Sequence, residues 1–363
     1  MGETTSEPQA ATLIELGEAI MLLRDLLPPP HPGLLARMTS EENEDWDPAG
    51  DASSSSLDLE MPAVEFSLGN GRPWPELASP IALDRAYGCL IGLAVGDALG
   101  SGGAPGEWTG ITTAALCVAE SLLTFDTVDQ EDLLRRLAAW LQTGRNTIHG
   151  QVVGMGATTR AAIETFIASG EPGGNSDDPG RAGAGSLVRN AAIAIAHAQD
   201  PMKADRLAQV QSRASHQTPE AVAACRLFTA IMVDALDGAG KEAALAPRVM
   251  SLPRKLLMLS AGMYKTKATS EIRPNAYAVD ALEAALWAVW QTASFKDALL
   301  AATELGGASA CVAALTGQLA GALYGMSTIP IAWLDGLALR HKIESIAGEL
   351  FCARAVPANP AER

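Results

Sequence analysis

The stretch from Arg85 to Glu120 constrains the fold of this chain more than any other part of its sequence. It contains an apolar helix, then a turn rich in glycine, and then Trp-Thr-x-x-Thr at the start of a second helix, in the sequence RAYGCLIGLAVGDALGSGGAPGEWTGITTAALCVAE. The stretch from Leu305 to Gly325, LGGASACVAALTGQLAGALYG, likewise places two glycines before a helix of small residues. These patterns predict helices that pack closely through small side chains.

Nearly every segment after Leu83 has the pattern of a helix, and none alternates polar and apolar residues as a strand does. The composition agrees, because 48% of the residues are hydrophobic but only 5% are aromatic. We therefore expect a compact all-α bundle of about ten or more helices. The predicted helices include Asp84–Leu93, Thr112–Thr124, Asp129–Gln142, Ser186–Gln199, Pro219–Leu236, Lys241–Met250, Ser309–Tyr324 and Pro330–Phe351.

Residues 1–80 are predicted to form an acidic extension that is separate from this bundle. They carry 15 Asp and Glu against 3 Lys and Arg, whereas the rest of the chain carries 27 against 23. Apolar residues at steps of three and four predict a helix over about residues 11–27, which the prolines at 28–30 end. The acidic, serine-rich segment from Glu41 to Ser56 reads as a disordered linker. The helix either packs on the main domain or docks a partner protein.

Charge and hydropathy exclude several classes of function. The net charge of −16 leaves no basic field for nucleic acid or an anionic membrane. No apolar run reaches the roughly 18 residues of a transmembrane helix, and the polar N-terminus does not read as a secretory signal. Five cysteines, an odd number in mostly apolar stretches, indicate a reducing compartment. We expect a cytoplasmic protein.

Seven segments resemble motifs of the ADP-ribosylglycohydrolase family, and they occur in that family's order. The resemblance covers about residues 83–352 and implies an orthogonal all-α domain, for which we expect the bounds 81–356. The segments are GLAVGDALG (Gly92 to Gly100), GEWTGIT (Gly106 to Thr112), GATTRAAI (Gly156 to Ile163), GAGSLVR (Gly183 to Arg189), SHQTPEAVAA (Ser215 to Ala224), AALWAVW (Ala284 to Trp290) and the stretch from Gly306 to Leu334.

The resemblance implies a pair of magnesium ions between two motifs that read WTDDT and GGDTDT in the family. The four acidic positions of these motifs hold Gly110, Ile111, Ala308 and Ala310 in this chain. The remaining oxygen donors of the motifs are the hydroxyls of Thr109, Thr112 and Ser309. Neutral hydroxyls do not compensate a divalent cation that prefers carboxylates and water. We therefore expect no metal cofactor. The short SGGAPGE segment before Trp108 also leaves no room for the family's lid.

Several positions are expected to contact a ligand if the family's binding mode is kept. Gly185 and Ser186 match the segment that lies against the diphosphate of ADP-ribose, although Ala184 replaces the usual asparagine. Trp108, Thr109 and Thr112 are the matching positions of the Trp-Thr motif. The alternative for Ser186 is structural: it caps its helix, and Arg189 pairs with a nearby acid.

Two weak catalytic candidates remain. Asp97 and Glu107 can form the spaced carboxylate pair used in metal-free glycoside hydrolysis. In the structural alternative Asp97 caps a turn and Glu107 faces solvent. Cys311 and His216 are either a nucleophile with its base or packing residues. His149 is isolated in the sequence.

Two functional hypotheses follow from the motifs that are kept and the carboxylates that are lost. In the first, the chain is a pseudoenzyme that binds an ADP-ribose-like ligand, or a protein partner through its acidic N-terminal region. In the second, it is a metal-independent hydrolase or related enzyme that acts on an ADP-ribosyl or other nucleotide-linked compound. The first needs only a binding surface, whereas the second needs convergent polar groups in a cleft.

Overall fold

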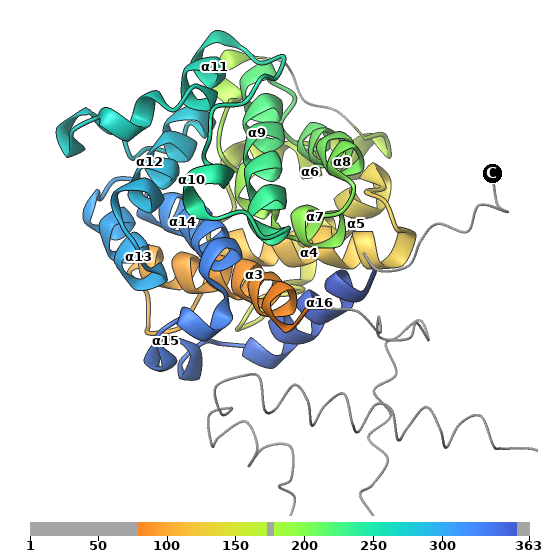
Figure 1. Ribbon diagram of the computed structural model, residues 1–363. Coiled ribbons are helices and arrows are strands. Elements are labelled where there is room, and N and C mark those ends of the chain that lie inside the picture. Colours follow the sequence, from red (N-terminus) through yellow and green to blue (C-terminus); the bar gives the residue numbers. More distant parts are fainter. Residues whose placement is uncertain (1–78, 173–177, 354–363) are drawn as a thin grey trace, which may run out of the picture. The chain divides into compact units, whose positions relative to one another are not determined.

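The computed structural model describes residues 79–172 and 178–353, and these ranges contain helices but no strand (Figure 1). The all-α prediction is therefore confirmed. The predicted helix over about 11–27, the acidic linker and the expected domain end at 356 lie outside the described residues.

The α-helices are α3 (Pro80–Ser101), α4 (Gly110–Phe125), α5 (Gln130–Thr143), α6 (Ala157–Ser169), α7 (Ala191–Ala196), α8 (Pro201–Arg213), α9 (Pro219–Leu236), α10 (Lys241–Ala244), α11 (Arg254–Ser260), α12 (Ala278–Gln291), α13 (Phe295–Glu304), α14 (Ser309–Tyr324), α15 (Ile331–Asp335) and α16 (Arg340–Ala353). The 3-10 helices are η1 (Pro179–Arg181), η2 (Leu187–Arg189), η3 (Met263–Thr266), η4 (Thr269–Glu271) and η5 (Met326–Thr328).

The helices α3 and α14 lie side by side and antiparallel, and their backbones touch (Figure 1). A Cβ atom added to Gly92 would lie 2.2 Å from the carbonyl oxygen of Gly317, and one added to Gly96 would lie 2.1 Å from that of Ala313. Such distances are too short for any side chain. The four-residue spacing of glycines in α3 therefore allows main chain to pack directly on main chain.

This contact corrects the prediction that the first helix ends at Leu93 and is followed by a glycine turn. The helix α3 continues to Ser101, because Gly96 and Gly100 face α14 instead of forming a turn. Its start also differs from the prediction, since the helix begins at Pro80. Asp84 accepts hydrogen bonds from the amide and hydroxyl of Ser327, at 2.9 and 2.8 Å, and so ties α3 to η5.

Some helices have the bounds predicted from the sequence, and others differ from them. The bounds of α9 and α14 coincide with the predicted ones, and Asp129 caps α5 by accepting a hydrogen bond from the Asp132 amide. The helix predicted to span 241–250 is shorter, because α10 ends at Ala244. The helix predicted over 330–351 is divided into α15 and α16, with Leu339 between them at a φ of 52°.

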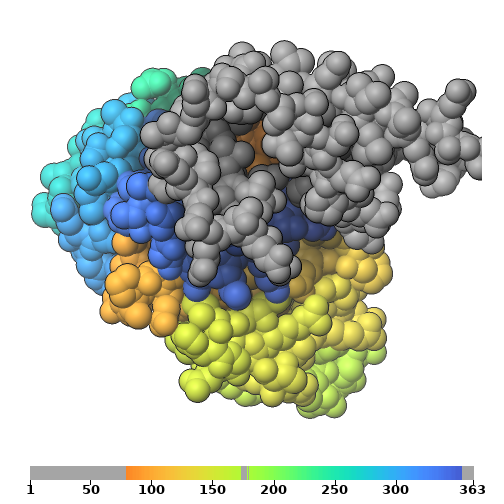
Figure 2. Space-filling view, turned by 90° about the horizontal axis from the view of Figure 1, so that it is seen from below, coloured from red at the N-terminus to blue at the C-terminus, as the bar shows by residue number. Residues whose placement is uncertain are grey.

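The C-terminal helices border the segment between α5 and α6 on one face of the molecule. In Figure 2 the blue atoms near the C-terminal end of the described chain adjoin yellow-green atoms around α6. Within the described residues, no helix combines the length and apolarity that crossing a membrane requires.

The glycine contact predicts a large cost for adding a single methyl group. We expect Gly92→Ala to lower the free energy of unfolding by about 2 to 3 kcal/mol, because the added carbon overpacks a rigid backbone contact. Gly240→Ala is the matched control, since a Cβ there meets no atom within 4 Å. Urea unfolding of both variants measures the difference, and equal midpoints would contradict the proposed packing.

Candidate functional site

Asp97 joins the end of α3 to the start of α4. Its carboxylate is fully buried and accepts four hydrogen bonds, from the amide and hydroxyl of Thr109 at 2.8 and 2.7 Å and from those of Thr112 at 3.0 and 2.8 Å. Burial raises the pKa of Asp97, while the four hydrogen bonds act in the opposite direction. Asp97 thus caps the turn that begins α4, and both of its oxygens are occupied.

A cleft of about 200 Å³ opens beside this turn. One wall is the segment 101–113 and the other is the loop 144–153 between α5 and α6. Pockets for whole small-molecule ligands are usually about 300 to 1,000 Å³, so this cleft suits one group of a larger ligand. The lining residues are Ser101, Gly103, Glu107, Trp108, Thr109, Gly110, Thr113, Thr147, Ile148, His149, Gln151 and Val153.

Glu107 and His149 meet in the cleft, one from each wall. The Glu107 Oε1 and His149 Nε2 atoms are 2.9 Å apart, and the two side chains are 42% and 62% exposed. The sequence suggested Asp97 as the partner of Glu107, but Asp97 is buried under the turn and does not line the cleft. The partnership with His149 was missed because the two residues are 42 positions apart and neither belongs to a periodic pattern.

The expected ligand-contact residues fall in two places. Trp108 and Thr109 line the cleft, and Thr112 lies below it against Asp97. The Gly185–Ser186 segment is not part of the cleft lining. Ser186 is fully buried, with its Oγ 2.9 Å from Ser212 Oγ. Its role in ligand binding, like that of Gly185, stays a prediction.

The helix predicted over 186–199 is replaced by two short helices, η2 and α7, and Ser186 does not cap either through its side chain. Arg189 is fully buried and donates to Gln211 Oε1, the Gln211 carbonyl oxygen and Ser215 Oγ at 2.8, 2.9 and 2.8 Å. These acceptors are neutral, so the predicted pairing of Arg189 with an acid is wrong. Burial lowers the pKa of Arg189 to about 10, which still leaves it charged at neutral pH.

His216 and Cys311 belong to different surroundings. The buried His216 ring has Nδ1 2.8 Å from Ser215 Oγ, and its edge lies against Gly185. Burial, together with the charge of Arg189, lowers the pKa of His216 to about 3. Burial and the nearby Asp97 raise the pKa of Cys311 to about 11, so the thiol is protonated at neutral pH. Within the described chain no hydrogen bond joins these two residues, and the geometry agrees with packing roles.

The residues at the two motifs do not fit a pair of magnesium ions. A Cβ on Gly110 would lie 2.4 Å from Trp140 Cζ2 and 2.6 Å from the Val153 carbonyl oxygen, so the space for an aspartate is filled. Ser309 donates its hydroxyl to the Gly100 carbonyl oxygen at 2.5 Å, and both threonine hydroxyls bind Asp97. In the part of the chain that the structure describes, no three His, Cys, Asp or Glu side chains converge.

Comparison with known proteins identifies relatives over the helical domain. The family model for ADP-ribosylglycohydrolase matches residues 78–360. A protein of Serratia proteamaculans named ADP-ribosylarginine hydrolase Tri1 is 38% identical over 291 residues, which cover 74% of this chain and 80% of the relative. The protein of that name from Pseudomonas putida is 40% identical, with 74% and 78% covered. A solved structure titled ADP-ribosylglycohydrolase-related protein complex has a TM-score of 0.67 and 33% identity, and covers 76% of this chain and 100% of that one.

The buried His216 predicts that acid destabilises the fold. Its folded pKa of about 3 lies below the ordinary value of 6.5, so its contribution to stability is complete above pH 6.5 and is lost as the pH falls. We expect a loss of about 2 kcal/mol from this residue between about pH 7.5 and about pH 5. His216→Gln should reduce the pH dependence of urea unfolding by that amount. Replacing the exposed His341 by Gln should not, and equal slopes for the two variants would refute the assignment.

Proposed function

Because the chain belongs to the ADP-ribosylglycohydrolase family, we propose that it hydrolyses the bond between ADP-ribose and a guanidinium group without the family's magnesium pair. The observation that carries this proposal is the contact of Glu107 with His149 in the cleft beside the Trp-Thr turn. The names of the two relatives at 38% and 40% identity support arginine as the source of the guanidinium. The cytoplasmic location expected from the sequence is part of the proposal.

The cleft offers groups that suit this chemistry. The Glu107 carboxylate attracts a guanidinium and can accept a proton from water, and its contact with His149 holds it in the cleft. A water oxygen bonds to the anomeric carbon while the carbon–nitrogen bond breaks and leaves its electron pair on the guanidine. Glu107 takes the proton that water loses, and the guanidine then takes that proton. The net reaction adds one water to the bond.

A second candidate is binding of an ADP-ribose-like ligand, or of a protein partner through residues 1–80, without turnover. The observation that favours it is the packing of Trp140 on Gly110. Gly110 occupies a position that is acidic in the family's motif, and its apolar contact with Trp140 leaves no group there that could bind a metal or take part in a reaction. Under this candidate the exposed Glu107–His149 pair is a surface contact of small energetic value.

A turnover assay separates the two candidates. We expect release of ADP-ribose from an ADP-ribosylated arginine peptide to be the same with Mg²⁺ and with EDTA. Glu107→Gln and His149→Ala should each lower kcat by about 100-fold, because the first removes the group that accepts the proton and the second removes the contact that holds this group in the cleft. Their thermal unfolding should match that of the unmodified chain, since both side chains are exposed.

Glu131→Gln serves as the matched control, because Glu131 is also an exposed carboxylate in an ion pair but lies on α5. It should leave kcat unchanged. Turnover that EDTA abolishes would overturn the metal-independent reaction. Saturable calorimetric binding of ADP-ribose with no turnover would select the binding function instead.

A further inference from the structure

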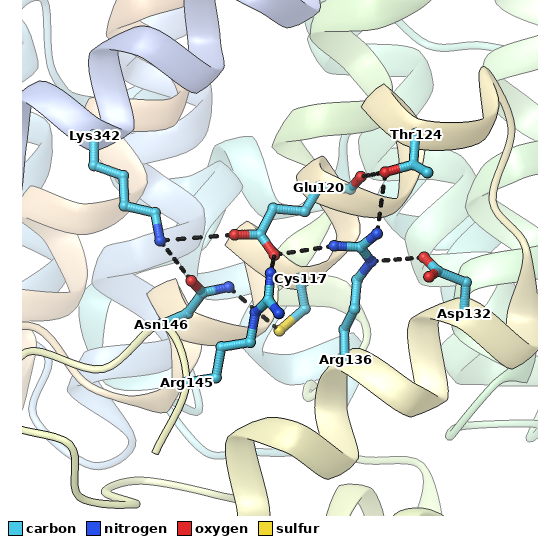
Figure 3. A network of polar contacts seen from close by, with 8 residues as sticks. All are labelled: Cys117, Glu120, Thr124, Asp132, Arg136, Arg145, Asn146 and Lys342. Carbon is cyan, nitrogen blue, oxygen red and sulfur yellow. Dashed lines mark hydrogen bonds and ion pairs between the residues drawn. The ribbon is translucent and has the colours of Figure 1, made fainter. Parts of the chain in front are cut away.

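The loop 144–153 carries His149, and its first residues are held by a polar network. The network consists of Glu120, Arg136, Arg145, Asn146 and Lys342, and we call it the Glu120 network (Figure 3). It joins α4, α5 and the loop, which follow one another in the chain, to α16, which is distant from them in sequence. The loop that it contacts forms one wall of the cleft.

Glu120 is the centre of this network and binds three cations. Its Oε2 atom lies 3.2 Å from both Arg136 Nη1 and Arg145 Nη2, and its Oε1 atom lies 3.6 Å from Lys342 Nζ (Figure 3). The Glu120 side chain is only 17% exposed, so these interactions are less screened than those of a surface pair. Arg136 is in turn fixed by Asp132 at 2.6 Å.

Asn146 connects the Glu120 network to the backbone of the loop. It adopts a left-handed conformation, with a φ of 60°, that few residues other than glycine accept. Three contacts hold it there: Lys342 Nζ donates to its Oδ1 at 2.6 Å, Thr113 Oγ1 donates to its carbonyl at 3.0 Å, and its Nδ2 lies 3.9 Å from Cys117 Sγ. Asn146, three positions before His149, is thus held in one backbone conformation.

The other end of the loop is also fixed, but by backbone contacts. The Gly110 amide donates to the Val153 carbonyl oxygen at 2.8 Å. Near the start, the Gly144 backbone lies so close to Gly150 that a Cβ on Gly144 would be 2.1 Å from the Gly150 carbonyl oxygen. Lys342, by contrast, reaches the loop through its side chain from α16, 196 positions away in the sequence. It can therefore be changed without altering the loop's own sequence.

We propose that Lys342 is a positioning residue for the cleft and holds His149 next to Glu107 through Asn146. This inference rests on the proposed function, in which Glu107 accepts the proton and its contact with His149 holds it in the cleft. Removal of the ammonium group leaves Asn146 Oδ1 without its donor and Glu120 with two cations instead of three. The loop then samples conformations in which His149 is away from Glu107. The opposite wall, which holds Trp108 and Thr109, is untouched.

The first test is kinetic. Lys342→Ala in the full chain should lower kcat on the ADP-ribosylated arginine peptide by about tenfold and leave KM within about twofold, because binding at the opposite wall is kept. Lys342→Arg should restore most of the rate, since it keeps a cation that donates. Lys203→Ala removes a comparable ion pair, with Asp126 at 3.2 Å, and should have no effect. A Lys342→Ala variant with unchanged kcat would overturn the inference.

A double-mutant cycle tests whether Lys342 acts through His149. In the His149→Ala background, Lys342→Ala should produce no further loss of kcat, because the group that it positions is already absent. Independent losses that multiply would show that Lys342 acts elsewhere and would refute the inference.

Amide hydrogen exchange tests the same inference without activity. Lys342→Ala should increase exchange in residues 144–153 by about tenfold and leave α3 and α14 unchanged. If the unmodified chain has no turnover, the proposed function fails, but faster exchange in this loop still supports the positioning role of Lys342. Unchanged exchange in the loop refutes that role even if the chain is an active hydrolase.

Discussion

Direct backbone contact between α3 and α14 is the constraint on which the remaining structure depends. At Gly88, Gly92, Gly96 and Gly100 the main chain of α3 approaches that of α14 so closely that no Cβ atom fits. Because the helices are antiparallel, the end of α3 meets the start of α14, and Ser309 donates to the Gly100 carbonyl oxygen at this crossing. The same contact therefore builds the core and brings the two motifs of the family to one place.

At this meeting point Gly110 is a packing position and Asp97 is a structural one. The Trp140 ring packs on Gly110. The Asp97 carboxylate accepts four hydrogen bonds from Thr109 and Thr112 and so stabilises the turn before α4. The polar groups able to handle protons lie further out, where Glu107 meets His149 in solvent. The fold is thus kept by groups that take no part in the proposed chemistry.

The sequence predicted those features that depend on neighbours in the chain. Asp129 and Pro219 mark helix starts through local hydrogen bonding and backbone geometry, and both helices were placed correctly. The glycines of α3 were read as a turn, because their function depends on a partner helix more than 200 residues away. The pairing of Glu107 with His149 could not be predicted either, because the two residues are 42 positions apart and His149 lies in a loop without periodicity. One alternative from the sequence pairs Arg189 with an acid, but the buried acceptors around it are neutral.

The glycine contact also affects the order in which the protein can acquire its structure during synthesis. The apolar helix α3 lies near the start of the described chain and is buried on most of its surface, yet α14 follows it by about two hundred residues. On the ribosome, α3 is complete long before its partner emerges from the exit tunnel. An apolar helix without its partner exposes surface that favours aggregation. The apolar surface of α3 therefore stays without its native cover until α14 has been synthesised.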